Sequence, residues 1–257
     1  MRKAFVIFLT IFFCAQFSRS YAALFIDDIY TTDKGHWDIE FTADYYRDVE
    51  TGFDLESGEN IKPASRELDV SAYFSYGLLD NLDVGLTVPY EFINGSDGKV
   101  NGFSDILIET KCRLREESRV LPGYALYFDV KPPSADKSDG IGTGRFDLSV
   151  NNIFTKNIGD NVFDLNLGYI FTLAKGEDNA FFYCFDIGRS LTEKLGICAE
   201  IYGENIFKGD FDDNIFIGAL TLSYEFNKNV SFEVSGAGGI SKASPDYQLS
   251  STLSFAF

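Results

Sequence analysis

Apolar and polar residues alternate along most of this chain, from residue 36 to its end. Trp37 and Ile39, for example, alternate with Asp38 and Glu40. A repeat of two residues is typical of a β-strand that has one apolar and one polar face. The pattern predicts twelve strands, near residues 36–46, 67–76, 82–90, 103–114, 124–131, 145–156, 162–173, 181–191, 195–204, 214–226, 230–239 and 247–257.

The connections between these strands are alternately short and long. The short ones fall at residues 77–81, 157–161, 192–194 and 227–229, with a longer turn at 115–123. The other set is polar and generally longer, at residues 47–65, 91–102, 132–144, 174–179, 205–213 and 240–246. Short turns at one end and long loops at the other are typical of an outer-membrane β-barrel, whose tilted strands have about 9–11 residues. We therefore predict an all-β fold, a transmembrane antiparallel up-and-down barrel of about twelve strands, with the N- and C-termini periplasmic.

The first 22 residues have the order of a secretory signal peptide. Two basic residues precede an apolar run at residues 4–15, and the small residues Ser20 and Ala22 occupy positions −3 and −1 of a cleavage site. That order predicts export and cleavage before Ala23, with a short N-terminal membrane anchor as the alternative. The expected organisation is a signal peptide at residues 1–22, a short periplasmic segment at 23–35 and a single barrel domain at 36–257. The short segment has too few residues to form a plug domain, so energised receptor transport is not expected.

Composition narrows the classes of protein that fit. The chain has 39 acidic and 22 basic residues and a net charge of −17, which becomes −20 when residues 1–22 are removed with Arg2, Lys3 and Arg19. This charge argues against nucleic acid as a partner, because phosphate binding needs a basic surface. No apolar run reaches the roughly 18 residues of a spanning helix. A soluble β-sandwich shows the same alternation as a membrane barrel, so other features must distinguish the two.

The ends of the predicted strands favour the membrane barrel. Aromatic residues recur there, as they do in the interfacial girdles of membrane barrels. One face of the last strand carries Tyr247, Leu249, Leu253, Phe255 and the terminal Phe257. This ending resembles the C-terminal strand signal that the bacterial barrel assembly machinery reads. It implies the outer membrane of a Gram-negative bacterium as the location, with membrane lipid and the assembly machinery as partners.

Several stretches resemble an outer-membrane β-barrel family named for meta-pathway phenol degradation. They are TDKGHWDIE (32–40), YGLLDNLDVGLTVPY (76–90), GFSDI (102–106) and the long stretch VKPPSADKSDGIGTGRFDLSVNNIFTKNIGDNVFDLNLGYIF (130–171). Together they cover most of the chain after the signal peptide, in the same order. The resemblance implies a porin- or transporter-like role, linked in some relatives to uptake of aromatic compounds. It supplies no agreed set of functional residues.

The alternation assigns a set of charged side chains to the inside of the barrel. The acids are Glu40, Asp44, Glu67, Asp69, Asp83, Asp105, Glu109, Asp129, Asp147, Asp164, Asp186, Glu200, Glu204 and Glu233, and the bases are Lys111, Arg113, Lys131 and Arg145. These residues either fill and hydrate a narrow lumen or form a cation-preferring pore, since rings of carboxylates favour cations. Barrels of about 8 strands have filled interiors and those of 16–18 have open channels, so about twelve strands should enclose a narrow passage.

Other reactive residues do not form a recognisable site. His36 lies at the start of the first strand, and the sequence has no nucleophile elbow for it to serve. The glycine-rich residues 140–144 neither follow a strand nor open a helix, as a dinucleotide loop would. Asp210, Asp212 and Asp213 lack EF-hand spacing and are expected at a solvated loop tip. We therefore expect no catalytic, cofactor-binding or metal site, and no enzyme.

Cys184 and Cys198 flank the predicted turn at residues 192–194. Pairing about that turn places Cys198 opposite a position near Gly188, about four residues of strand rise from Cys184. A disulfide needs its two Cα atoms within about 7 Å, so the cysteines are expected to pack as small side chains without a bridge.

The sequence is compatible with three functions. The first is an outer-membrane channel for passive passage of small solutes, among them cations or aromatic compounds, through a narrow acidic lumen. The second is a barrel with a blocked lumen that has a structural or surface-binding role through its acidic outer loops. The third is a soluble secreted β-sandwich.

Overall fold

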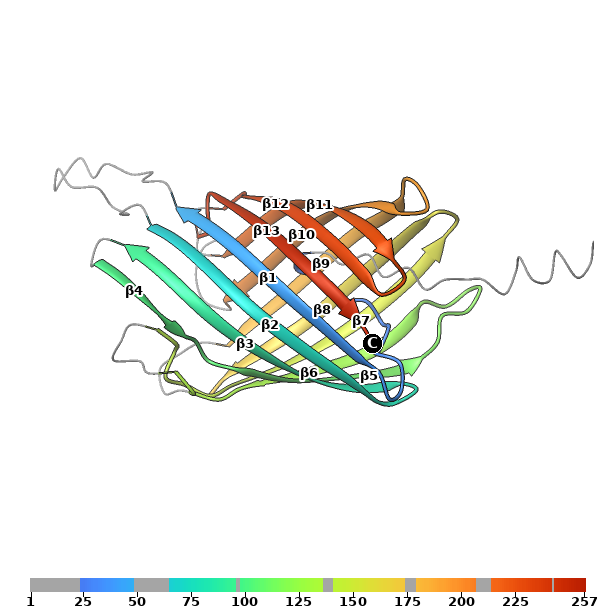
Figure 1. Cartoon of the computed structure of the whole chain (residues 1–257), viewed down its shortest axis with the longest axis horizontal. Coiled ribbons are helices and arrows are strands. Elements are labelled where there is room, and N and C mark those ends of the chain that lie inside the picture. The colour runs from blue at the N-terminus through green and yellow to red at the C-terminus, as the bar shows by residue number, and fades with distance from the viewer. Residues whose placement is uncertain are drawn as a thin grey trace, which may run out of the picture.

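The computed structural model describes residues 24–48, 65–95, 98–135, 141–173, 179–206, 214–241 and 243–257. Every regular element in these ranges is a β-strand (Figure 1). The strands are β1 (Trp37–Asp48), β2 (Ser65–Leu79), β3 (Leu82–Gly95), β4 (Gly98–Phe103), β5 (Leu107–Arg115), β6 (Gly123–Lys131), β7 (Asp147–Ile158), β8 (Asn161–Thr172), β9 (Ala180–Ser190), β10 (Leu195–Ile206), β11 (Ile215–Asn227), β12 (Val230–Gly239) and β13 (Tyr247–Ala256). Among the described residues, the search for a helix long and apolar enough to cross a bilayer finds none.

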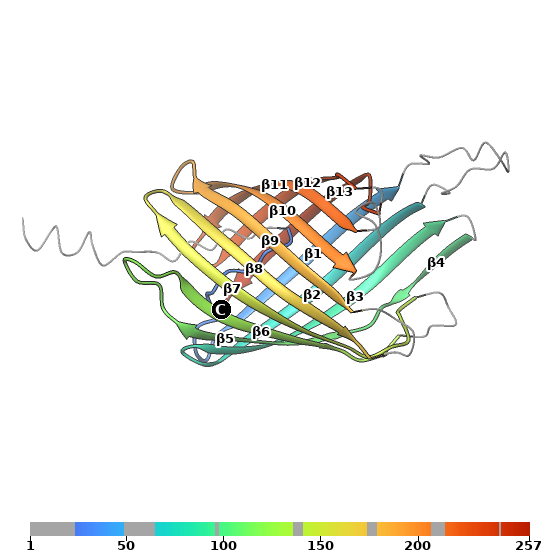
Figure 2. The same cartoon turned by 180° about the vertical axis from the view of Figure 1, so that it is seen from behind.

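Twelve of the strands form a closed antiparallel barrel, as the alternation predicts. The first and last strands close it, with β1 paired to β13 from Asp38↔Ala256 to Arg47↔Tyr247. Seen from two opposite sides, the strands tilt in a common sense around one interior (Figures 1 and 2). Closure removes the free sheet edges that would otherwise leave backbone groups unpaired in lipid.

One further strand, β4, lies outside the barrel of twelve. The prediction of a loop at residues 91–102 was therefore wrong. Here β3 continues to Gly95 and turns into β4, which pairs with β3 from Gly95↔Gly98 to Tyr90↔Phe103. The polar residues near the tip hid a hairpin that extends beyond the level at which β3 pairs with β5. Gly98 has a φ of 124°, a conformation that favours glycine and lets the chain reverse.

The two faces of the barrel wall differ sharply in polarity. Apolar side chains such as Phe41 and Leu249 are about half exposed on the outside, with exposed fractions of 48% and 54%. At alternating positions, polar side chains such as Asp186 and Thr221 are almost completely buried. An apolar outer face and a polar inner face are what a barrel in a bilayer needs, and they are the reverse of a soluble sandwich.

Aromatic contacts gather near both ends of the strands. At the short-turn end, the rings of Trp37 and Tyr76 lie 4.9 Å apart. At the long-loop end, the rings of Tyr45 and Tyr247 lie 6.3 Å apart. Their positions fit the aromatic girdles of membrane barrels.

The cysteines follow the predicted register. Cys198 pairs with Gly188 across β9 and β10, and Cys184 lies opposite Tyr202. Both thiols are buried and free. Their spacing along the strands accounts for the lack of a bridge.

Residues 24–33, which we call the strap, lie inside the barrel. The sequence assigns residues 23–35 to a short periplasmic segment before the barrel, and its location relative to the membrane stays a prediction. In the structure, strap backbone groups bond to inward-facing side chains of β3, β7, β8 and β10. Ile29 of the strap is completely buried. Side chains of the wall thus provide hydrogen-bond partners for the backbone of the strap, which forms no strand of its own. The two-residue pattern of the sequence does not reveal these contacts.

Candidate functional site

Glu200 of β10 holds the N-terminal end of the strap. The backbone N–H of Leu24 donates to Glu200 Oε1 at 2.7 Å, and that of Phe25 donates to Oε2 at 2.9 Å. Leu24 and Phe25 also pack against the buried Ile217 and Ala219 of β11. One carboxylate and one apolar patch therefore fix this end of the strap to the wall.

The middle of the strap is held by neutral side chains. The amide of Asn166 on β8 accepts from the N–H of Asp27 at 3.2 Å and donates to its carbonyl at 2.7 Å. Two residues later, the N–H of Ile29 donates to Thr155 Oγ1 on β7 at 3.1 Å. Both backbone groups of Asp27 are thus satisfied as they would be in a sheet.

The side chain of Ile29 fills an apolar socket in the wall. It packs against Ala125 of β6 and Ile153 of β7, and all three residues are completely buried. A Cβ added to Gly123 would lie 2.0 Å from Ile29 Cδ1, so a larger residue at that position would force the Ile29 side chain to shift. Burying a side chain of this size stabilises a structure by roughly 1.5–3 kcal/mol. The socket makes Ile29 the main apolar anchor of the strap.

The far end of the strap reaches the opposite side of the barrel. The N–H of Thr32 donates to Asp83 Oδ2 on β3 at 2.9 Å. Thr32 Oγ1 lies 2.7 Å from Asp38 and 2.8 Å from Ser75. The strap contacts therefore run along the inner face of the wall from β10 to β3.

Lys111 of β5 ties the strap to this side of the wall. Its Nζ lies 3.2 Å from Asp27 Oδ1 and 3.4 Å from the carbonyl oxygen of Tyr30. The side chain of Lys111 is only 12% exposed. A buried cation needs such partners, because desolvation strongly disfavours an uncompensated charge.

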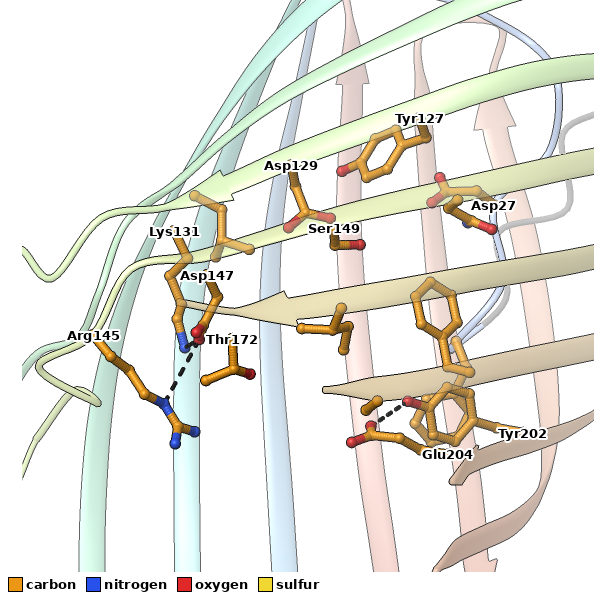
Figure 3. A pocket seen from close by; sticks show the side chains of 16 residues that line it. Asp27, Tyr127, Asp129, Lys131, Arg145, Asp147, Ser149, Thr172, Tyr202 and Glu204 are labelled. Carbon is orange, nitrogen blue, oxygen red and sulfur yellow. Dashed lines mark hydrogen bonds and ion pairs between the residues drawn. The ribbon is translucent and has the colours of Figure 1, made fainter. Parts of the chain in front are cut away.

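A cavity of about 670 Å³ lies beside the strap (Figure 3). Strap residues Phe25 and Asp27 contribute to its lining, together with residues of β5 to β10 near the long-loop ends of these strands. Its lining residues are Phe25, Asp27, Leu107, Tyr127, Asp129, Lys131, Arg145, Asp147, Ser149, Asn151, Ile170, Thr172, Ala180, Phe182, Tyr202 and Glu204. The volume and the mixed lining fit a small organic molecule.

One side of the cavity is charged. Lys131 Nζ lies 2.6 Å from Asp147 Oδ2, and Arg145 Nε lies 3.9 Å from the same oxygen (Figure 3). Tyr127, between this group and the strap, donates its hydroxyl to Glu109. Asp147 is thus paired with two bases, Lys131 and Arg145.

The other side of the cavity is aromatic. The rings of Phe25 and Tyr202 stack at 5.0 Å, and the rings of Phe182 and Tyr202 are 6.5 Å apart. Tyr202 donates its hydroxyl to Glu204 at 2.8 Å (Figure 3). A Cβ added to Gly168 would lie 2.0 Å from the Phe182 ring, so this glycine makes room for the ring inside the barrel. The cavity thus offers an apolar stack beside a carboxylate.

The structure places sixteen of the eighteen charged residues assigned to the lumen on strands, and Asp105 and Arg145 between strands. Those on strands alternate with the apolar side chains of the outer face, and Asp83, Asp147, Asp164, Asp186, Glu200 and Glu233 are buried. Register brings Asp164, Asp186 and Glu200 into one row across β8, β9 and β10. The lumen charges therefore form local groups and not one continuous ring.

A second acidic group lies toward the long-loop end of β2 and β3. Carboxylate oxygens of Glu67, Asp69 and Glu91 lie within 4.8 Å of one another. Asp44 stands opposite Asp69 in the β1–β2 register. Glu91 is absent from the predicted set because the sequence assigned it to a loop.

Two carboxyls between strands hold connecting segments in place. Burial acts to raise the pKa of Asp105, but bonds from the N–H groups of Ala135 and Thr143 hold that pKa below its usual value. Burial likewise acts to raise the pKa of Glu117, and bonds from Asn157 and Lys156 hold it low. Both carboxyls thus act as charged anchors for their segments.

Several residues that shape the site escaped the sequence prediction. Asn166 and Thr155 are neutral, and Tyr127, Phe182 and Tyr202 are aromatic, so a search for charged residues passes over them. Strand parity alone could have placed all five on the inner face. The strap could not have been found in this way, because its own residues show no two-residue alternation.

Other sequence predictions fall elsewhere. Residues 1–22, most of the connection at 47–65, and Asp210, Asp212 and Asp213 lie outside the described residues. His36 is exposed, with its Nδ1 3.2 Å from the carbonyl oxygen of Lys34. The residues assigned to the assembly signal share the outer face at the C-terminal end: Tyr247, Leu249, Leu253 and Phe255 on β13 and Phe257 just after it.

Comparison with known proteins gives one family and a group of similar barrels. The family described as "Putative MetA-pathway of phenol degradation" matches residues 27–257. An outer membrane channel from Pseudomonas putida F1 is 12% identical with a TM-score of 0.73, and the match covers 91% of this chain and all of that one. A KdgM porin bound to oligogalacturonate is 11% identical with a TM-score of 0.55, over 86% and 99% of the two chains.

The same barrel also occurs in a protein with another role. The translocator domain of the autotransporter NalP from Neisseria meningitidis is 12% identical with a TM-score of 0.53, and the match covers 87% and 88% of the two chains. No curated protein matches this chain. At these identities the similar structures establish the outer-membrane barrel fold, and function must be argued from the lumen.

Proposed function

This chain belongs to the family described as "Putative MetA-pathway of phenol degradation", and we propose that it is an outer-membrane channel for passive passage of small solutes. The observation that carries the proposal is the lumen itself. A cavity of about 670 Å³, lined by charged and aromatic side chains, lies inside a closed barrel with an apolar exterior. Passage requires sites that bind a solute weakly enough to release it, and a partly polar cavity meets this need.

The proposal includes an orientation in the membrane. The signal peptide at residues 1–22 is cleaved during export, and both ends of the mature chain face the periplasm. The outer face of β13, with Tyr247, Leu249 and Phe255, is recognised by the barrel assembly machinery and then contacts lipid. Exposed apolar side chains and the short turns at one end support this orientation.

We expect cations and neutral aromatic compounds to pass more readily than anions. The acidic residues Asp129 and Glu204 line the cavity, and Asp147 is already paired with Lys131 and Arg145. Phe25, Phe182 and Tyr202 provide flat apolar surfaces against which a ring can stack. An anion would be repelled by the carboxylates that line the cavity.

Recordings in planar bilayers test this function. The mature protein should give a small conductance, and a salt gradient should produce a reversal potential of the sign for cation preference. Phenol and benzylamine should reduce the ion current at lower concentration than benzoate does. Anion preference, or stronger block by benzoate, would contradict the proposal.

The strap favours a second candidate function. It occupies part of the lumen along the wall from β10 to β3, so a barrel closed at all times could serve a structural or surface-binding role through its outer loops. In that case folded protein would give no conductance under any voltage, and liposomes containing it would not swell in small sugars. Heat-modifiable migration on gels would show that the silent protein is folded.

A further inference from the structure

We propose that the outer face of β1 to β4 binds the phosphorylated headgroup of a lipid at the long-loop end of the barrel, through Arg47, Arg66 and Lys99. In the orientation of the proposed function, this lipid belongs to the outer leaflet of the membrane. The long-loop ends of β1, β2 and β3 lie side by side with β4, at the end of the barrel away from the C-terminus (Figure 1). The site is separate from the solute channel, because it lies on the outside of the wall and not in the lumen.

Strand register places the three bases in one row. Arg47 of β1 stands opposite Arg66 of β2. Asn94 of β3 stands opposite Arg66 on one side and Lys99 of β4 on the other. Residues of one register row point to the same face of a sheet, and Phe92, which has the same parity as Asn94, is 45% exposed on the outside. Neighbouring strands lie about 4.8 Å apart, so the row runs for about 14 Å along the outer face.

The two arginines of the row need an anion between them. Like charges directly opposite each other on neighbouring strands are destabilising, because their Cβ atoms lie only about 4.5–5.5 Å apart. Arg47 donates from Nη1 to the hydroxyl of Tyr247 at 3.2 Å, and this partner is neutral. Within the part of the chain that the structure describes, Arg47, Arg66 and Lys99 form no ion pair. A phosphate accepts hydrogen bonds from two guanidinium groups at once, so it would replace the repulsion by attraction.

Bases near the short turns differ from this row, because each of them has an acidic partner. Lys156 of β7 pairs with Glu117, and Arg189 Nη2 of β9 lies 3.7 Å from Asp160 Oδ2. On β1 to β4, by contrast, every carboxylate whose side chain the structure describes has the parity of the inner face. The chain has 39 acidic and only 22 basic residues, so an outward row of bases without acids is not a result of composition. Its charge is complementary to that of an anionic headgroup.

The surface next to the row suits the acyl chains of a lipid. Tyr45, Leu68 and Phe92 occupy the next outward positions on β1, β2 and β3, toward the middle of these strands. One position further, the rings of Tyr90 and Phe103 lie 5.0 Å apart, and Phe103 is 67% exposed. Bases at the end of the strands and apolar side chains beside them match the two parts of a lipid, whereas a free phosphate would use the bases alone.

Native mass spectrometry of the detergent-purified protein tests the site. The probe is synthetic diphosphoryl lipid A, and the comparison is the same glycolipid without its phosphates. We expect the wild type to retain the phosphorylated probe several-fold more than the other one, and Arg66→Gln to retain it several-fold less than the wild type. The double variant Arg47→Gln, Arg66→Gln should lose the preference for phosphate. Arg189→Gln is the matched control, because it removes one base near the short turns and should leave retention unchanged.

Three outcomes would overturn the proposal. Equal retention of the two probes by the wild type would show that the phosphates are not recognised, and this comparison needs no variant to fold. Displacement of the lipid by inorganic phosphate at the same concentration would show that the site binds a free anion. Equal losses in Arg66→Gln and Arg189→Gln would show that only the net charge matters. None of these results depends on whether the barrel conducts, so a failure of this site and a failure of the channel are distinguishable.

Discussion

The two ends of the lumen illustrate different uses of one barrel wall. Toward the short turns, Glu200, Asn166, Thr155 and Asp83 bind the backbone of the strap. Toward the long loops, inward side chains border a cavity of about 670 Å³. The difference comes from what fills the interior, since the wall has the same alternating pattern at both levels. Small inward residues such as Gly123 leave space that the strap occupies.

Loss of the Ile29 side chain should have the largest effect on this contrast. Ile29→Ala empties a completely buried socket, which typically costs about 2–5 kcal/mol. The cost falls on strap docking and not on the barrel, so the backbone amides at residues 24–33 should exchange hydrogen much faster. Hydrogen exchange with mass spectrometry measures the change.

The matched control is Ile187→Ala, because Ile187 lies on the outer face of β9 and is 42% exposed. That substitution should leave exchange in the strap unchanged. Equal protection of the strap in Ile29→Ala and the wild type would show that the socket does not hold it.

Substitution of a glycine in the wall should displace the strap and so reduce the difference between the two ends of the lumen. Gly123→Val places side-chain atoms where Ile29 Cδ1 now lies, so the strap must shift or leave its socket. We expect more frequent and larger current fluctuations in single-channel recordings. Gly159→Val is the control, because nothing lies within 4 Å of a Cβ there, although its φ of 63° makes some local strain unavoidable.

Removing charge from the cavity should change selectivity by a smaller amount. Glu204→Gln eliminates a carboxylate at the cavity wall while retaining an acceptor for Tyr202, so cation preference should fall. The reversal potential in a salt gradient reports this change. Glu193→Gln, in an exposed turn, removes the same charge at a distance and should leave the reversal potential almost unaltered.

The smallest effect should come from acidification of the Asp105 segment. Because the folded pKa of Asp105 lies below its usual value of 3.8, the charged form stabilises the folded segment above that pH. The stabilisation is lost as pH falls through the folded pKa. The protection factors of the Ala135 and Thr143 amides, which compare their exchange with that of unprotected amides at the same pH, should then fall at acidic pH. Asp105→Asn should show low protection at every pH, and wild-type protection in that variant would contradict the role of the carboxylate.

The sequence predicts the wall of this protein much better than its contents. Alternation gave the strands, the closed sheet and the register that places Cys198 opposite Gly188, because side-chain direction has a fixed period of two. It missed β4, since polar residues near Gly98 resemble a loop. It also missed the strap, whose contacts use backbone N–H groups that every residue carries.

The candidate site was predictable to a similar degree. Parity selected Asp147 and Glu204, which line the cavity, and Glu200, which binds the strap. It could not show that Lys131 pairs with Asp147 or that Phe182 lies over Gly168, because both depend on the register between strands and on space inside the barrel. Local pattern fixes the direction of a side chain, and only the closed fold fixes its neighbours.

If the strap narrows the passage through the barrel, its removal should increase the ion current, so deletion of residues 24–33 is the most direct test of the proposed channel. Single-channel conductance of the shortened and full-length mature proteins should be measured in the same bilayer and salt, after heat-modifiable migration shows that both are folded. We expect the shortened barrel to conduct several-fold more, with cation preference retained. Equal conductance in the two proteins, or none in either, would contradict the account.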